Sequence, residues 1–385
     1  MKFFKLKNKS RNLIRLSKSV LSKEEKKAVN KVINEGYLGM GKHVQNFENE
    51  LQSMIFKRPT ACVVNGTAAL HLALQACGIG EGDEVLVQSI TYLASFQAIT
   101  ASGATPISCD IDLLKLTLDL EDARQKITSR TKAIMPVHYA GDLGAYQGIY
   151  DLARDFNLRV IEDAAHAFGG KKNGQYIGSF GDIVCFSFDG IKNITCGEGG
   201  CVTSNDLNVI NKIKDSRLLG VNKDTEQRFS GKRSWEFDVL EKGWRYHMSD
   251  LMASIGSAQL KKLDKFSKKR QNIATYYDTK LKDLDQIYIF NRDYKSIVPH
   301  IYPIKLGDKI KREHFKSYLE KRQIQTGIHY KPNHLLTLFK KNDLSPLLKT
   351  ESIYKKIISL PLHPELKYKE IDYIVDIIKE YLNSL

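Results

Sequence analysis

Apolar and polar positions alternate in two patterns along the first half of the chain. Short apolar runs, such as Glu84–Gln88 and Thr105–Cys109, are followed by polar residues, which is typical of buried strands. Between these runs, apolar residues recur every three or four positions, which predicts amphipathic helices. Strands and helices follow one another in turn, and this order predicts an α/β fold built on a largely parallel sheet with helices on both faces.

The pattern also predicts where each element lies. Strands are expected over residues 61–64, 84–88, 105–109, 132–137, 159–162, 183–188 and 201–203, and helices over 22–35, 44–56, 92–101, 120–127, 145–156 and 206–218. The first helix has the clearest start, because Ser22 and Glu25 stand at capping-box spacing, and Gly36 is expected to end it.

After residue 218 the alternation weakens. Residues 220–243 are polar and predict a long loop, and residues 248–266 predict one long helix. A smaller α+β unit is expected beyond them, with strands over 287–290 and 298–304, helices over 311–322 and 368–382, and a loop over 326–334. We therefore expect a loosely held extension (residues 1–20), a large domain (21–260) whose first helix could pack on the small domain, and a small C-terminal domain (261–385).

Composition is that of a soluble globular protein, with 42% hydrophobic and 27% charged residues in 385. No apolar run is long enough to predict a transmembrane helix, and the basic start at residues 1–7 lacks the apolar stretch of a secretory signal. The six cysteines form no Cys-x-x-Cys pair. This predicts reduced cysteines, a cytoplasmic location and no metal site.

The chain is strongly basic, with a net charge of 59 − 44 = +15. Such a charge favours an anionic partner, which could be nucleic acid, an acidic membrane surface or a phosphorylated ligand. The lysines are scattered among glutamates, and no zinc finger or RNA-binding aromatic motif occurs. Charge alone does not choose between a nucleic-acid-binding protein and an enzyme that acts on a phosphorylated ligand.

One lysine lies in an unusual position. Lys192 stands in a glycine-rich, polar stretch between two apolar runs, Ile183–Phe188 and Cys201–Thr203. Burial between strands disfavours an ammonium ion and lowers its pKa, which makes the amine a nucleophile. The alternative is an ordinary solvated lysine in a loop.

Other reactive groups follow neighbouring strands of the predicted sheet. They are the Asn65-Gly66-Thr67-Ala68 turn, Tyr92, His138, Asp163 and His166. Ligands of parallel sheets bind beyond the carboxyl ends of the strands, so these groups are expected to meet Lys192. The turn at Gly66 could seat a phosphate at a helix N-terminus, or it could be a plain strand-to-helix turn.

A lysine, a carboxylate, an aromatic ring and a phosphate seat are the groups that pyridoxal phosphate (PLP) requires. Metal, hydrolase and nucleotide-loop chemistries fit less well. No second histidine stands at metal-ligand spacing from His166, no Gly-x-Ser-x-Gly elbow supports a serine hydrolase, and no P-loop occurs.

In these features the chain resembles the DegT/DnrJ/StrS family of PLP-dependent sugar aminotransferases, over roughly residues 20–382. The motifs that carry the resemblance are Gly36-Tyr37-Leu38-Gly39-Met40-Gly41 with Phe47-Glu48, Asn65-Gly66-Thr67-Ala68-Ala69-Leu70, Pro136-Val137-His138, Val160-Ile161-Glu162-Asp163-Ala164-Ala165-His166, and Phe186-Ser187-Phe188 with Lys192 and Gly197-Glu198-Gly199-Gly200. The resemblance implies the fold-type I architecture, which has a large, mostly parallel sheet domain and a smaller α+β C-terminal domain.

The resemblance also assigns roles. Lys192 would bind the cofactor covalently and then act as general base and acid, Asp163 would pair with the pyridine nitrogen, Tyr92 would stack on the ring, and His166 would lie against it or be a core histidine. The phosphate would be held by Gly66, Thr67, Ala68 and Ser187. The sugar nucleotide would meet Tyr37, His138, His329 and Tyr330, for each of which ordinary packing is the alternative.

One motif departs from the family pattern. Where the family often has Gly-aromatic-Asn-aromatic-Arg, this chain has Gly243-Trp244-Arg245-Tyr246-His247. In the family this segment reaches into the site of the partner subunit, so the resemblance implies a homodimer with a shared active site. Arg245 would then meet a phosphate of the cofactor in place of the asparagine.

The expected function is transfer of an amino group, with L-glutamate as donor, to a nucleotide-linked 4-keto-6-deoxyhexose, dTDP-linked as first choice, in O-antigen or lipopolysaccharide synthesis. A lysine at position 192 favours transamination over the dehydration that family members with histidine there carry out. Amination of a 3-keto sugar or a UDP- or GDP-linked substrate is the alternative within the class. A regulatory protein that binds nucleic acid is the distant alternative.

Overall fold

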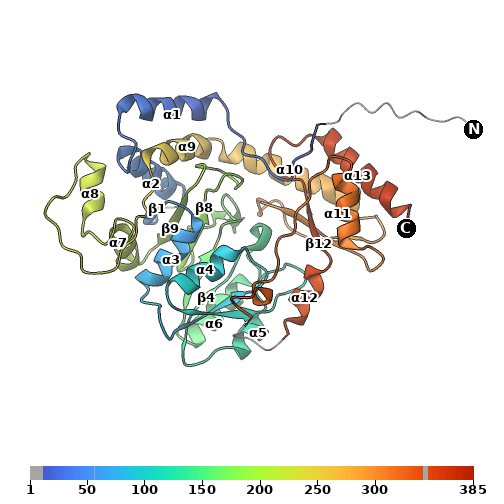
Figure 1. The fold of residues 1–385 in the computed structure, drawn as a ribbon, viewed down its shortest axis with the longest axis horizontal. Coiled ribbons are helices and arrows are strands. Elements are labelled where there is room, and N and C mark those ends of the chain that lie inside the picture. The colour runs from blue at the N-terminus through green and yellow to red at the C-terminus, as the bar shows by residue number, and fades with distance from the viewer. Residues whose placement is uncertain (1–11, 56, 341–345) are drawn as a thin grey trace, which may run out of the picture.

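The computed structural model describes residues 12–55, 57–340 and 346–385. In these ranges a seven-stranded sheet has the order β1-β9-β8-β5-β4-β2-β3, and a three-stranded sheet has the order β10-β11-β12 (Figure 1). The strands of the larger sheet are β1 (Thr60–Val63), β2 (Glu84–Gln88), β3 (Thr105–Cys109), β4 (Thr131–Met135), β5 (Arg159–Asp163), β8 (Ile183–Ser187) and β9 (Gly200–Ser204). All neighbours are parallel except β9, which runs antiparallel to both β1 and β8.

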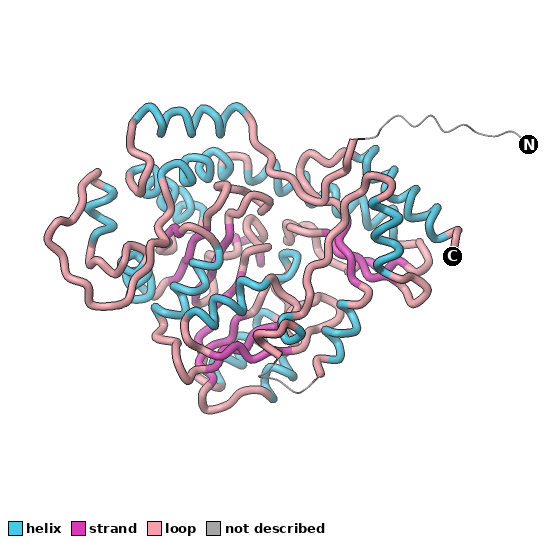
Figure 2. Tube along the Cα trace, viewed as in Figure 1, coloured by secondary structure: helices cyan, strands magenta, loops and turns pink. Residues whose placement is uncertain are grey.

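Helices cover both faces of this sheet, as Figure 2 shows. Successive strand residues point to opposite faces, so in β8 Cys185 packs in one apolar cluster, and Val184 and Phe186 pack in another. The Cys185 face is covered by α3 (Gly66–Ala76), α4 (Leu93–Ala101) and α7 (Leu207–Ser216). The other face is covered by α2 (Lys42–Met54), α5 (Leu120–Gln125), α6 (Tyr146–Asp155) and α9 (Asp250–Leu260). The predicted fold class is therefore confirmed.

The smaller sheet has its own core. It is antiparallel, with β10 (Ile287–Ile289), β11 (Tyr302–Leu306) and β12 (Ile357–Leu360). Its apolar side packs against α10 (Leu263–Leu281), α11 (Arg312–Glu320) and α13 (Tyr368–Leu382). The exact domain boundaries drawn from the sequence stay a prediction.

Several expected elements differ in the structure. The single helix over residues 248–266 is wrong, because the chain ends α9 at Leu260, turns, and starts α10 at Leu263. At this turn the Lys262 amine bonds Glu25 of α1, which holds the turn in place. The loop over 220–243 contains a short helix, α8 (Asp224–Phe229), and the strand expected over 298–304 begins only at Tyr302.

Some short elements gave no sequence signal. They are the hairpin of β6 (Lys171–Lys172) and β7 (Gln175–Tyr176), α12 (Leu348–Tyr354), β12, and two single-turn helices at Tyr139–Gly141 and Asn333–Leu335. Elements of two to seven residues offer too few positions for a period to show.

The N-terminal segment is held more firmly than expected. Residues 1–11 of the predicted extension lie outside the described residues. From there on, Ile14 is buried and pairs with Ile324, and the Ser19 hydroxyl bonds the Gly190 carbonyl. The expectation of a loose extension is therefore wrong for this part. The chain then enters α1 (Lys23–Glu35), where the Ser22 N–H donates to Glu25 at 2.8 Å, as the capping box predicts, and α1 packs along α9.

None of the helices in the described ranges combines the length and apolar character that crossing a bilayer requires.

A buried ion pair ties α2 to the central sheet. The guanidinium of Arg217, at the end of α7, donates to the Glu48 carboxylate at 2.5 Å and to the Cys62 carbonyl at 2.6 Å. The same carboxylate oxygen accepts the Cys62 N–H at 2.7 Å. Both side chains are almost fully buried, so each depends on the other for its charge balance.

Replacing Glu48 with alanine should therefore leave a buried, unpaired guanidinium and lower the free energy of unfolding by about 3–5 kcal/mol. Urea unfolding followed by circular dichroism measures this loss. Arg154→Ala is the control, because its ion pair with Asp151 is exposed to solvent and should contribute little to stability. Equal effects of the two substitutions would contradict a structural role for the buried pair.

Candidate active site

A cavity of about 520 Å³ opens at the edge of the large sheet where its parallel strands end. The residues that follow β1, β2, β5 and β8 line it, together with the segment before β11 and the segment after α11 (Arg312–Glu320). Of the residues predicted from the sequence, it brings together Gly66, Thr67, Tyr92, Asp163, His166, Ser187, Lys192, His329 and Tyr330. The strand-end argument thus placed most of the candidate groups in one cavity.

Lys192 lies in the loop after β8, and buried side chains hold this loop. Arg270, from α10, donates to the carbonyls of Ile191 and Lys192 at 3.4 Å. The Asn193 amide donates to the Phe168 carbonyl at 2.9 Å and to the Val298 carbonyl at 3.2 Å. Contacts from segments next to both the large and the small sheet therefore fix the backbone at Lys192.

Burial lowers the pKa of Lys192 to about 8, and the nearby carboxylates of Asp163 and Asp189 oppose the decrease. A substantial fraction of the amine is therefore neutral and nucleophilic slightly above neutral pH, whereas almost none of an ordinary lysine is. The sequence predicted such a lowered pKa for a lysine buried between strands.

Asp163, the last residue of β5, is held at both carboxylate oxygens. Oδ2 accepts the Ser95 hydroxyl at 2.7 Å, and Oδ1 accepts the Ala165 N–H at 3.2 Å. Ser95 is fully buried in α4, and its oxygen also lies 3.0 Å from the Thr91 hydroxyl. The sequence analysis missed Ser95. The sequence feature that could have identified Ser95 is a serine near the start of the helix that follows a strand end.

His166 is buried beside the lysine. Its Nδ1 accepts the Ala140 N–H at 3.4 Å, and its Nε2 lies 3.0 Å from the Tyr330 hydroxyl. Burial, with the positive charge of Lys192 nearby, holds the pKa of His166 well below its usual range. A neutral ring that accepts at Nδ1 carries its proton on Nε2, so His166 donates to Tyr330 and leaves the tyrosine proton free for another acceptor.

The sequence analysis also missed His300. Its ring centroid lies 4.5 Å from that of His166, and its side chain lines the cavity. Burial, together with Lys192, likewise holds the pKa of His300 well below its usual range. The apolar pattern predicts a strand over this position, where a histidine gives no sign that it faces a site.

The N-terminus of α3 forms the expected seat for an anion. The Asn65 side chain caps this helix by accepting the Ala68 N–H at 2.8 Å. A Cβ on Gly66 would lie 2.8 Å from the Cβ of Ser187, so only glycine allows the helix start and the serine to approach this closely. The partial positive charge of the helix end and the serine hydroxyl then face the same space.

Four predicted residues lie elsewhere in this chain. Ala68 is buried behind the seat, with its N–H bonded to Asn65. Tyr37 donates to the Met40 carbonyl at 3.1 Å, and His138 lies 2.6 Å from Glu162 in a buried pair. Arg245 is exposed, and its backbone pairs with Leu218. The structure does not bring these four residues to the cavity wall.

The residues that do line the cavity fit PLP. They supply an amine of lowered pKa, a fixed carboxylate, a small-residue seat for phosphate, and the ring of Tyr92, whose centroid lies 5.7 Å from that of Tyr330. Among the described residues there is no group of three His, Cys, Asp or Glu side chains that could hold a metal ion.

A family model described as the DegT/DnrJ/EryC1/StrS aminotransferase family matches residues 19–379. The chain belongs to this family.

Relatives share nearly the whole length of the chain. GDP-perosamine synthase of Escherichia coli O157:H7 is 37% identical over 369 residues, which cover 94% of this chain and 97% of the relative. Helicobacter pylori PseC, an aminotransferase involved in the biosynthesis of pseudoaminic acid, superposes with a TM-score of 0.90 at 28% identity, over 97% of this chain and 100% of that one. The PLP form of Spr1654 from Streptococcus pneumoniae superposes with a TM-score of 0.86 at 29% identity, over 94% and 97%.

These comparisons confirm the predicted family, the fold-type I architecture and the class of PLP-dependent sugar aminotransferase. When bound, PLP supplies an aldehyde that condenses with amines and a ring that stabilises negative charge on the substrate carbon. The individual roles assigned to the site residues stay proposals.

The lowered pKa of Lys192 predicts how the cofactor-free protein captures PLP. Because the neutral amine is the nucleophile, the capture rate should rise about tenfold between pH 7 and pH 9 and then level off. Stopped-flow absorbance of the bound cofactor measures this rate, with Lys192→Ala as the variant that should not retain PLP covalently. A rate that continues to rise through pH 10 would mean an ordinary lysine and contradict the prediction.

The hydroxyl of Ser95 is predicted to position Asp163 for the cofactor. Ser95→Ala removes a hydrogen bond to a charged group and should weaken PLP binding about tenfold, as measured by spectral titration. Ser102→Ala is the matched control, because that hydroxyl bonds the Ile99 carbonyl just after the same helix. If both variants bind PLP like the wild type, Ser95 has no positioning role.

Proposed function

We propose that this protein transfers an amino group from L-glutamate to the keto group of a nucleotide-linked sugar. The observation that carries the proposal is the Lys192 amine, with its pKa lowered to about 8, in one cavity with Asp163 and the anion seat at α3. Membership of the aminotransferase family supports it. The first-choice acceptor is a dTDP-linked 4-keto-6-deoxyhexose aminated at C4, for O-antigen or lipopolysaccharide synthesis in the cytoplasm.

In this proposal the residues of the cavity have separate roles toward the cofactor and the substrate. Asp163 keeps a negative charge at the pyridine nitrogen, Tyr92 packs on the ring, and Gly66, Thr67 and Ser187 hold the phosphate. The Lys192 amine removes a proton from the substrate carbon and returns it one position away. Tyr330, which accepts a hydrogen bond from His166, directs its own proton toward the substrate, and His329 lies next to it on the cavity wall.

The charge of the cavity wall supports a shared active site. Of the described residues that line it, Lys192 alone is lysine or arginine, whereas Asp163, Asp189 and Glu198 are carboxylic acids. The cofactor phosphate and a nucleotide diphosphate both need cationic contacts that this wall lacks. We propose that Arg245 of a second copy meets the cofactor phosphate, because it is exposed in the single chain. The homodimer and a contact of Tyr37 with the sugar nucleotide remain part of this proposal, whereas His138 is buried in its pair with Glu162.

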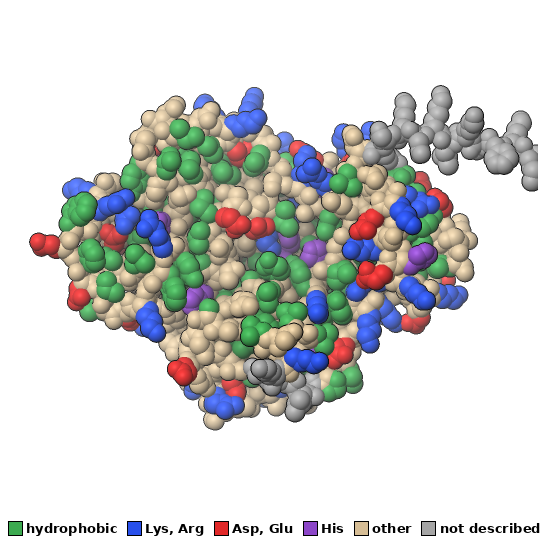
Figure 3. Space-filling view, in the orientation of Figure 1, with side chains coloured by type: hydrophobic (Ala, Val, Ile, Leu, Met, Phe, Trp, Pro, Cys, Tyr) green, Lys and Arg blue, Asp and Glu red, His purple; other side chains and the backbone are tan. Residues whose placement is uncertain are grey.

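A second candidate is a GDP-linked substrate. It is favoured by the relative named GDP-perosamine synthase, which is 37% identical over 94% of this chain. Amination at C3 and a UDP-linked sugar stay within the same enzyme class, and a panel of substrates separates them. A nucleic-acid-binding protein was suggested by net charge alone, and on the face shown in Figure 3 the basic side chains are scattered among acidic ones.

The test is an assay of the purified protein with L-glutamate and a panel of dTDP-, GDP- and UDP-linked 4-keto and 3-keto sugars. Mass spectrometry should detect one sugar that gains an amine. Lys192→Ala should lower kcat at least about a thousandfold, since it removes the general base and the covalent anchor. The exposed Lys132→Ala is the control and should keep full activity. If glutamate is consumed with another ketone and no nucleotide sugar is aminated, the substrate class is wrong.

A further inference from the structure

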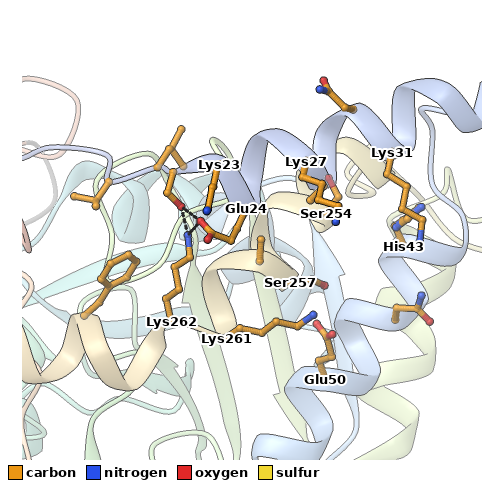
Figure 4. A pocket seen from close by; sticks show the side chains of 18 of the residues that line it. Lys23, Glu24, Lys27, Lys31, His43, Glu50, Ser254, Ser257, Lys261 and Lys262 are labelled. Carbon is orange, nitrogen blue, oxygen red and sulfur yellow. Dashed lines mark hydrogen bonds and ion pairs between the residues drawn. The ribbon is translucent and has the colours of Figure 1, made fainter.

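A second hollow, of about 1380 Å³, lies away from the active site. It is bounded by α1 on one side and by α2 and the turn between α9 and α10 on the other (Figure 4). Its floor includes small and apolar side chains, among them Ala28, Ala258 and the buried Phe266. It holds none of the residues that line the PLP cavity, so the reaction does not account for it.

Two rows of lysines line this hollow with the same spacing. One row is Lys23, Lys27 and Lys31 on α1, and the other is Lys261 in the turn after α9 with Lys265 and Lys269 on the first turns of α10. All six are exposed. Residues four apart share one side of a helix, so the row on α1 extends about 12 Å along one wall. Figure 4 shows Lys27 and Lys31 on α1, and Lys261 on the opposite side pointing toward Glu50.

The positive charge of these rows is not neutralised within the described part of the chain. None of the six lysines forms an ion pair there. Three acidic residues nearby are already engaged, because Glu24 pairs with Lys262, Glu35 with Lys42 and Glu365 with Lys18. Glu50, toward which Lys261 points, is one carboxylate beside six lysines and forms no ion pair among the described residues. Like charges four residues apart destabilise a helix, so the rows carry a cost that folding alone does not explain.

We infer that this groove binds an acidic polypeptide segment, in a role separate from amino-group transfer. Carboxylates along a helix or an extended chain can reach both rows, while its apolar side chains meet the floor. The groove is concave, which does not suit a flat bilayer surface. Among its described lining residues there is no exposed Phe, Tyr or Trp ring for base stacking, since Phe266 is only 6% exposed. A second copy of this chain that met the groove with the same face would bring the same lysine rows to it, so its charge does not match the groove.

The experiment measures binding of a fluorescent twelve-residue glutamate-rich peptide to the PLP-loaded protein by anisotropy, with a glutamine-substituted peptide as the neutral probe. Two double variants each neutralise two of the three lysines in one row, Lys27→Gln with Lys31→Gln and Lys265→Gln with Lys269→Gln. Because exposed ion pairs are individually weak, each variant should bind the acidic peptide about three- to tenfold less tightly. The neutral peptide should not bind, and added salt should weaken the acidic one.

A matched control removes the same charge elsewhere. Lys132→Gln with Lys282→Gln changes two exposed lysines remote in sequence from the groove and should leave peptide binding unchanged. All variants should keep aminotransferase activity, which shows that they are folded and separates this test from that of the reaction. The inference is overturned if the control weakens binding as much as the groove variants, if only one row matters, or if single-stranded DNA or anionic vesicles compete for the groove more tightly than the peptide.

Discussion

The site depends on keeping one amine out of water. Removing Lys192 from solvent costs free energy in the ammonium form, and the fold meets that cost in two ways. Asp163 and Asp189 supply negative charge that partly restores the pKa, and Arg270 and Asn193 hold the loop so that the amine cannot move out to solvent. The anchors come from a helix of the smaller unit and from the loop itself, so the reactivity of one side chain depends on how the two sheets are joined.

The three histidines around Lys192 add no positive charge to the site. His166, His300 and His329 all lie close to it, and burial keeps the pKa of each below the usual value for histidine. They are therefore neutral near pH 7 and act through hydrogen bonds and ring contacts. The positive potential that an anionic ligand needs is then concentrated at Lys192 and at the start of α3, which separates the reacting end of the cavity from its phosphate end.

Much of the fold and the site followed from the sequence, and the failures have physical causes. Strand ends of a parallel sheet share an edge, so Gly66, Asp163 and Lys192 could be placed together without coordinates. Ser95, His300 and Arg270 could not, because their importance arises from contacts between distant segments that leave no local pattern. Ile14 was missed for the same reason. His138 has the residue type of a site but lies in a buried pair with Glu162, a distinction that only packing reveals.

The reversed direction of β9 has a consequence for how the reactive loop is held. Strand β8 leaves the sheet at the active-site edge, and β9 re-enters from that same edge, with Ser187 opposite Gly200. The connection therefore behaves as a wide hairpin whose two ends are clamped side by side. A parallel neighbour would have required the chain to cross to the far edge before returning. The sheet therefore fixes the two points between which the lysine is suspended, and the residues between them, Asp189 and Asn193, set the charge around the amine and its position.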